Sequence, residues 1–241
     1  MKKKIVALCL CVALAVVAIG GATLAYFTDT DAKTNTFTVG KVDITLEENF
    51  DEDSAKLLPA TGSAQDGTLK NGVTKEIAVT VEKGSEDTYV RVHIAIPNIL
   101  DSGDPEFDAG KNVLHFNYDP DSIGAGKWDW SKTAGTPYDG DDWNYYETTI
   151  DGIAYNVYVV TYGTALEAGK TTPEYAMQQV YLDSRVTSSD MEKIDDALNG
   201  NWQIKVFAEG CQAAGFGNAY AALNEAFGTP GTEGYVAPWN K

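Results

Sequence analysis

The chain has 241 residues, of which 44% are hydrophobic, and a formal net charge of −17 at pH 7. This charge repels nucleic-acid phosphates and anionic lipids, so it excludes a nucleic-acid-binding protein and favours solubility and contact with divalent cations. Only Cys211 lies beyond the first 25 residues, so no intramolecular disulfide is expected in the rest of the chain. Stability must then come from one hydrophobic core, which a chain of this length can build.

The first 25 residues have the anatomy of a secretory signal peptide. Three lysines at positions 2–4 precede an apolar stretch at residues 5–19, and two glycines end that stretch. Small side chains before the cut place cleavage after Ala25 and make Tyr26 the new N-terminus. An uncleaved membrane anchor is the alternative, because no charged residue occurs at positions 5–28.

Apolar side chains alternate with polar ones along most of the remaining chain, which places one set on a core face and the other in water. In the strand predicted at residues 89–96, Arg91 and His93 fall on the water-facing side. About eight such strands predict a single all-β domain over residues 26–241, folded as a two-sheet antiparallel sandwich of jelly-roll or immunoglobulin-like type. The predicted strands cover residues 76–82, 89–96, 113–118, 142–150, 153–162, 175–183 and 202–209.

Two or three short helices are expected to interrupt the strands, and two of them have clear end signals. Ser189 and Glu192 have the spacing of a capping box, and Asn199 followed by Gly200 predicts the end of the first helix. The second helix is predicted over residues 218–227. Apolar residues repeat with helical period in both, so we interpret them as core-facing.

The apolar alternation changes phase at Gly40. Phe37 and Val39 fall at odd positions, whereas Ile44 and Leu46 fall at even ones. Since a slip of one residue turns side chains to the opposite face, a straight strand through both sets would expose one of them. Gly40 therefore marks either a bulge within one sheet or a bend between strands of different sheets. In the second case residues 26–39 form a separable N-terminal arm.

The segment ATLAYFTDTDAKTNTFTVGKVDITLEE, residues 22–48, resembles the TasA/camelysin family of exported proteins of Gram-positive bacteria. The shared features are the cleavage site, an early aspartate, the segment Asn35–Gly40 and the alternating strand Val42–Leu46. Weaker similarity continues in TVEKGSEDTYVRVHI and VFAEGCQAAGF. The resemblance implies a jelly-roll-like fold and a precursor that is cut by the dedicated signal peptidase SipW.

The resemblance also implies secretion to an extracellular matrix or cell surface, where members of the family form biofilm fibres. The best-known members insert their freed N-terminus, as a strand, into a groove of the next subunit. Carried over to this sequence, the donor-strand residues are Tyr26, Phe27, Phe37 and Val39, with Gly40 as the elbow. The expected partners are further copies of the chain, head to tail, a SipW-type signal peptidase and other matrix proteins. Membrane contact is expected only through the uncleaved signal.

Camelysin is described as a metallopeptidase, so zinc chemistry has to be considered. A zinc hydrolase needs three protein ligands around an open position, commonly an HExxH motif with a third ligand. This sequence has only two histidines, His93 and His115, each isolated within a predicted strand. We therefore predict that the protein is not an enzyme and has no catalytic residues and no resident metal or other cofactor. Calcium binding by acid clusters at residues 51–53, 119–121 and 139–142 stays as an alternative.

The sequence thus predicts a structural subunit that assembles into extracellular fibres by donor-strand exchange after signal cleavage. Two alternatives stay open. One is a monomeric secreted or cell-surface binding module in which Trp128, Trp130 and Trp143 contact carbohydrate or protein. The other is a camelysin-like metallopeptidase.

Overall fold

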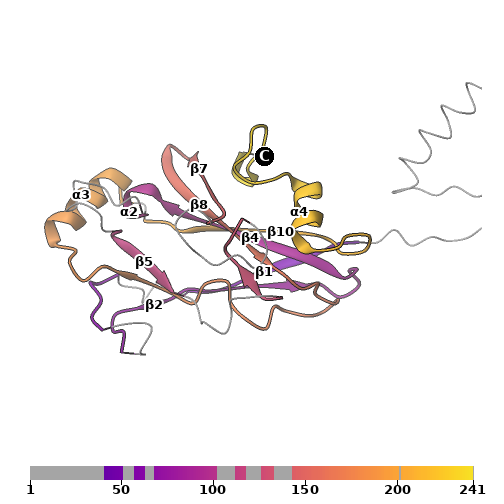
Figure 1. The fold of residues 1–241 in the computed structure, drawn as a ribbon. Coiled ribbons are helices and arrows are strands. Elements are labelled where there is room, and N and C mark those ends of the chain that lie inside the picture. The colour runs from indigo at the N-terminus through magenta and orange to yellow at the C-terminus, as the bar shows by residue number, and fades with distance from the viewer. Residues whose placement is uncertain are drawn as a thin grey trace, which may run out of the picture. The chain divides into compact units, whose positions relative to one another are not determined.

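The computed structural model of the chain describes residues 41–50, 57–62, 68–101, 112–117, 126–132, 143–200 and 202–240. These residues form antiparallel sheets with a few short helices, so the predicted all-β sandwich is confirmed (Figure 1). The signal segment, the N-terminal arm and the three acid clusters lie outside the described residues. Within the described ranges, no helix is long and apolar enough to cross a membrane.

The first sheet is built around β3. β1 pairs with one edge of β3 in antiparallel register, and the backbone of residues 169–178 exchanges hydrogen bonds with the other edge. That segment continues into β9, which pairs with β2 and β5. The first sheet is thus made of a two-stranded part, β1 (Ile44–Asn49) with β3 (Glu76–Val81), and a three-stranded part in the order β2 (Val73–Thr74), β9 (Gln179–Leu182) and β5 (Leu114–Asn117).

The second sheet is antiparallel throughout, in the order β10, β4, β8 and β6. β7 also pairs with β8, along the edge that faces away from β4. The two longest strands, β4 and β8, therefore form its centre. The strands are β4 (Thr88–Pro97), β6 (Trp128–Asp129), β7 (Tyr145–Ile150), β8 (Ile153–Tyr162) and β10 (Lys205–Gln212).

The main core lies between the two sheets. Val79 of β3 and Val92 of β4 are completely buried within it, as alternation predicts. Trp128 and Trp130 are also completely buried, and the ring of Trp130 stacks on Phe116 with centroids 4.9 Å apart. The prediction that Trp128 and Trp130 form a binding surface is therefore wrong, because these rings fill the core.

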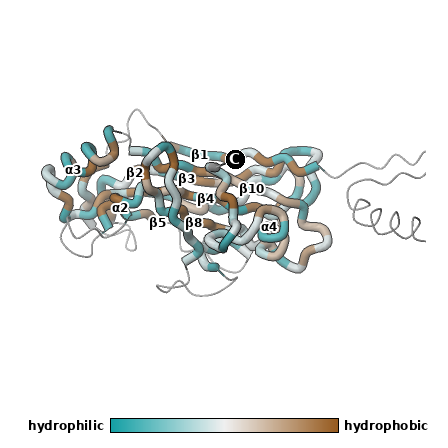
Figure 2. Tube along the Cα trace, turned by 90° about the horizontal axis from the view of Figure 1, so that it is seen from above, coloured by the Kyte–Doolittle hydropathy of each residue, from teal (hydrophilic) through white to brown (hydrophobic). Residues whose placement is uncertain are grey.

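The second face of β4 is also covered, so the prediction that Arg91 and His93 face water is wrong. Their exposed fractions are 1% and 0%. Helix α4 (Ala219–Phe227) contacts β4 and β10, and Ala237 packs with residues of β7 and β8 in a second, smaller core. The alternation along β4 could not show this, because the cover comes from the distant C-terminal part of the chain. Figure 2 shows α4 from this part beside β10 and β4.

Both predicted helices are present, at opposite ends of the strands (Figure 1). The N-cap of helix α3 (Ser188–Leu198) is Thr187, two residues before the predicted Ser189, and Thr187 forms the capping box with Asp190. The helix ends as predicted at Asn199, which adopts the left-handed conformation with φ 50°. Among the described residues, the structure also has short helical elements that the sequence did not predict, including α2 (Asn98–Asp101) and a 3-10 helix (Pro238–Asn240).

Candidate functional site

The site residues predicted from the sequence lie outside the described part of the chain. They are the cleavage pair Ala25 and Tyr26, and the donor-strand residues Tyr26, Phe27, Phe37, Val39 and Gly40. The structure instead describes the sandwich that follows the arm. β1 begins at Ile44, and Asp43 before it is fixed to the β3–β4 turn: its N–H donates to Ser85 Oγ at 3.0 Å, and its carbonyl accepts from the N–H of Glu82 at 2.9 Å.

Two strand edges meet on one side of the sandwich. In the described ranges, β1 pairs only with β3 and β10 pairs only with β4, so the outer backbone of each strand has no strand partner there. Ile44 of β1 lies against Gly210 of β10, where an added Cβ would be 2.9 Å from Ile44 Cγ2. The two edges are therefore close at this end of the strands, and glycine is required for the approach.

Half-buried apolar side chains follow both edges. On the neighbouring inner strands the same kind of residue is completely buried, as Val79 and Ile94 show. We call this half-exposed row between the two edges the β1/β10 seam, and its side chains all pack against the main core. They are Ile44, Leu46, Trp202, Ile204, Val206 and Ala208.

The far end of the seam opens into a pocket of about 550 Å³. Its lining is mainly apolar and includes Phe50 just after β1, Trp202 just before β10 and Met191 of α3. The charged side chains among the lining residues are Glu48 and Lys75. A pocket of this size and character accepts an apolar or aromatic side chain.

Lys75 is unusual because its ammonium group lies inside this mostly apolar wall. Its exposed fraction is 4%, and it forms an ion pair with Glu48, whose side chain is 31% exposed. The ammonium also lies 4.7 Å from the centre of the Phe50 ring. Burial lowers the pKa of Lys75 from 10.5 to about 8, since the charged form loses its hydration.

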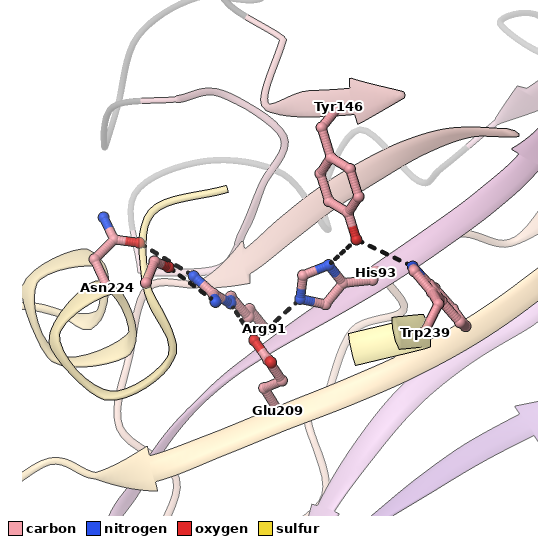
Figure 3. A network of polar contacts seen from close by, with 7 residues as sticks. Arg91, His93, Tyr146, Glu209, Asn224 and Trp239 are labelled. Carbon is pink, nitrogen blue, oxygen red and sulfur yellow. Dashed lines mark hydrogen bonds and ion pairs between the residues drawn. The ribbon is translucent and has the colours of Figure 1, made fainter. Parts of the chain in front are cut away.

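A second polar cluster lies on the covered face of the second sheet (Figure 3). Glu209 Oε2 accepts hydrogen bonds from Arg91 Nε at 2.7 Å and lies 3.1 Å from His93 Nε2. On the other side of the imidazole, His93 Nδ1 lies 3.3 Å from the Tyr146 hydroxyl, which accepts from Trp239 Nε1 at 3.0 Å. The cluster thus ties β4, β7 and β10 to the C-terminal segment.

Electrostatics in this cluster favour the charged form of Glu209. Burial raises the pKa of the Glu209 carboxyl, but the hydrogen bonds and charges of His93 and Arg91 outweigh burial and hold this pKa below its ordinary value. Burial raises the pKa of the Tyr146 hydroxyl far above its ordinary value, with a further contribution from the nearby Tyr235. Glu209 is therefore a paired anion and Tyr146 a neutral phenol at neutral pH.

Neither histidine is isolated, which corrects the interpretation of the sequence. His93 has both ring nitrogens engaged, by Glu209 and by Tyr146. His115 Nε2 lies 3.0 Å from Asp183 Oδ2, and Arg185 donates to the same carboxylate at 2.9 Å. No group of three or more His, Cys, Asp or Glu side chains in the described ranges is arranged to hold a metal ion.

Sequence reasoning missed both the seam pocket and the buried cluster. The sequence held a signal for the cluster. Arg91 and His93 lie on the same face of their strand, and Glu209 is the acidic residue in the predicted strand at residues 202–209. Burying such a residue requires a partner of opposite charge. The pocket had no comparable signal, because its lining comes from eight separate stretches of the chain.

Taken together, the fold defines an all-β sandwich in which the outer edges of β1 and β10 have no strand partner within the described ranges, and a chain that continues beyond β1 at the N-terminus. Residues 1–89 match the family model described as camelysin metallo-endopeptidase, a family that covers the TasA and camelysin proteins. The resemblance predicted from the N-terminal motifs is thereby confirmed over these residues. No curated protein and no solved structure matches the chain.

Proposed function

We propose that this protein is a secreted structural subunit of extracellular fibres, in which residues 26–39 of one copy add as a strand to the β1/β10 seam of the next. The observation that carries the proposal is the seam, where two strand edges without a strand partner in the described ranges lie beside half-buried apolar side chains. Strand addition uses both features: main-chain groups supply affinity, and pockets for alternate side chains supply specificity.

The lengths of the seam and of the arm are compatible with strand addition. β1 has 6 residues, so the seam beside it spans ~20 Å at 3.3 Å per residue. The arm, residues 26–39, is more than twice as long. Its Phe37 and Val39 have the alternate spacing that turns both side chains to one face, and the pocket beside Phe50 has room for an aromatic ring.

Cleavage after Ala25 is the proposed switch. An uncut signal would hold the arm in the membrane, whereas a SipW-type signal peptidase would free Tyr26 and with it the arm. A contact that joins the front of one subunit to the edge of the next is heterologous, so it propagates as a filament instead of closing as a dimer. The proposed location is therefore the extracellular matrix or the cell surface.

A peptidase role is not part of this proposal, although the matching family model is described as a metallo-endopeptidase. The reason lies in the two histidines. Zinc needs a free imidazole nitrogen, and both ring nitrogens of the completely buried His93 are already engaged. His115 is held by Asp183, which Arg185 also binds in a bidentate pair.

The test compares the chain that begins at Tyr26 with a chain that begins at Gly40. We expect the first to form filaments in negative-stain images and the second to stay a folded monomer, since it keeps the sandwich but lacks the donor strand. A synthetic peptide of residues 26–39 should bind the shorter chain, and a scrambled peptide should not.

Two results would contradict the proposal. One is an undiminished yield of filaments from the chain that lacks the arm. The other is a chain from Tyr26 that sediments as a monomer at every concentration, with the amides of residues 26–39 protected from hydrogen exchange, because the arm would then be paired within its own sandwich.

A further inference from the structure

The strands β1 and β10 run in opposite directions along the seam. Ile44, the first residue of β1, lies against Gly210 near the end of β10. At the other end of the seam, Phe50 just after β1 and Trp202 just before β10 line the same pocket. A strand that adds between β1 and β10 is therefore antiparallel to one of them and parallel to the other.

The chain enters the sandwich at the Gly210 end of the seam. Asp43 precedes β1 and is bonded through its N–H and its carbonyl to the turn between β3 and β4. Gln212, the last residue of β10, pairs with Thr88 directly after the same turn. The arm, residues 26–39, precedes Asp43 by only a few positions, so the arm of each copy joins its sandwich at this end.

A head-to-tail filament needs the two ends of the seam for two different neighbours. The arm of each copy leads from the Gly210 end to the next copy, which takes up the space beyond that end. The copy that donates an arm to this seam must then lie beyond the opposite end, near Trp202. Residue 39 of the donated arm is therefore nearest Trp202, and Tyr26 is nearest Gly210. A strand with this direction runs opposite to β10.

On the basis of the proposed function, we propose that the donated arm lies antiparallel to β10 and parallel to β1, with Phe37 opposite Ile204 and its ring in the pocket beside Phe50. Antiparallel addition to β10 continues a sheet that is antiparallel throughout its described strands. Ile204 packs against the main core and lines the pocket. Residues opposite each other in an antiparallel pair turn to the same face, so Phe37 and Val39 turn toward the core.

This register places Thr30 of the arm opposite Cys211. Cys211 lies seven residues beyond Ile204 on β10, and Thr30 lies seven residues before Phe37. The Cα atoms of such a pair are about 5 Å apart, a separation that a disulfide spans. Thr38 turns to the same face as Thr30 but lies about 26 Å further along the strand. In the reversed direction, Thr38 would be the residue near Cys211.

The experiment is disulfide mapping in filaments of the chain that begins at Tyr26, whose only cysteine is Cys211. Thr30→Cys and Thr38→Cys form a matched pair, since both exchange a threonine on the same face of the arm. Filaments of each variant are imaged and then treated with a mild oxidant. We expect Thr30→Cys to give a ladder of covalent oligomers on a non-reducing gel, and Thr38→Cys to give none. Adding Cys211→Ser to the first variant should abolish its ladder.

Three results would overturn the proposed direction while leaving strand addition intact. They are a ladder from Thr38→Cys alone, ladders of equal yield from both variants, and filaments that give no ladder from either. Failure of the proposed function looks different: the unchanged chain forms no filaments, or Thr30→Cys gives only a crosslink within one copy, which migrates as a monomer. Either of these two results would overturn both proposals.

Discussion

The outer face and the β10 edge of the second sheet differ in how far the rest of the chain covers them. Its outer face carries the charged residues Arg91 and Glu209, and the C-terminal part of the chain covers both of them completely or nearly so. Its β10 edge carries apolar Val206 and Ala208, and these are left half-exposed. Polarity is therefore a poor guide to exposure in this protein. A fold shaped by stability alone would cover the apolar row first, so the open edge supports the proposal that a further strand adds there.

The largest expected effect lies on the covered face. Glu209→Gln removes the negative charge that pairs with Arg91 and leaves that cation buried without compensation. Breaking a buried pair in this way costs about 3–5 kcal/mol. We expect the free energy of unfolding, measured with urea, to fall by about that amount.

The matched control is Glu225→Gln, the same change on the exposed side of α4, which should stay within about 0.5 kcal/mol of the unchanged chain. If Glu209→Gln cost no more than the control, the cluster would not stabilise the covered face, and the contrast between the two sides would be lost.

The next effect lies on the open edge and concerns assembly more than folding. Leu46→Gln places a polar amide in the seam, whereas Glu47→Gln places the same side chain on the exposed face of the same strand. We expect the first variant to lower the yield of filaments at least tenfold while it destabilises the monomer by only about 1–2 kcal/mol, because the side chain is already half-exposed. The second variant should assemble normally.

Filament yield is measured by pelleting and negative-stain imaging, with urea unfolding as the check that the monomer is folded. Equal yields from Leu46→Gln and Glu47→Gln would show that the seam does not receive the arm.

The alternation of apolar residues was enough to predict the sandwich. Residues 153–162 were predicted as a strand and form β8 with the same bounds. The apolar positions of the strand at residues 202–209 share one face, as predicted, and pack on the main core. Local periodicity reports which residues share a face, and for this purpose a single strand is sufficient.

Periodicity does not report what covers the other face. The polar face of β4 was assigned to water because Arg91 and His93 are polar, yet residues more than 100 positions away bury it. Contacts of this kind depend on the tertiary path of the chain, and a single sequence gives no direct signal for it.

The smallest expected effect concerns Lys75, the buried cation at the open edge, which pairs with the half-exposed Glu48. The pKa of Lys75 is about 8 in the folded chain and 10.5 without burial, so between these values the unfolded chain holds a proton that the folded chain has released. Unfolding then takes up a proton, and the free energy of unfolding must rise as the pH increases through this window. The ion pair with Glu48 opposes part of the shift, which leaves a gain on the order of 2 kcal/mol.

Urea unfolding at pH 7.5 and at pH 9.5 measures this gain, and Lys75→Met, which cannot titrate, should lack it. An identical pH dependence in both chains would show that Lys75 keeps its ordinary pKa and is hydrated. If the gain appears, and adding the arm peptide of residues 26–39 enlarges it, then the strand in the seam must shield Lys75 further from water. That result would place the arm at the pocket beside Phe50, because Lys75 lies in the wall of this pocket.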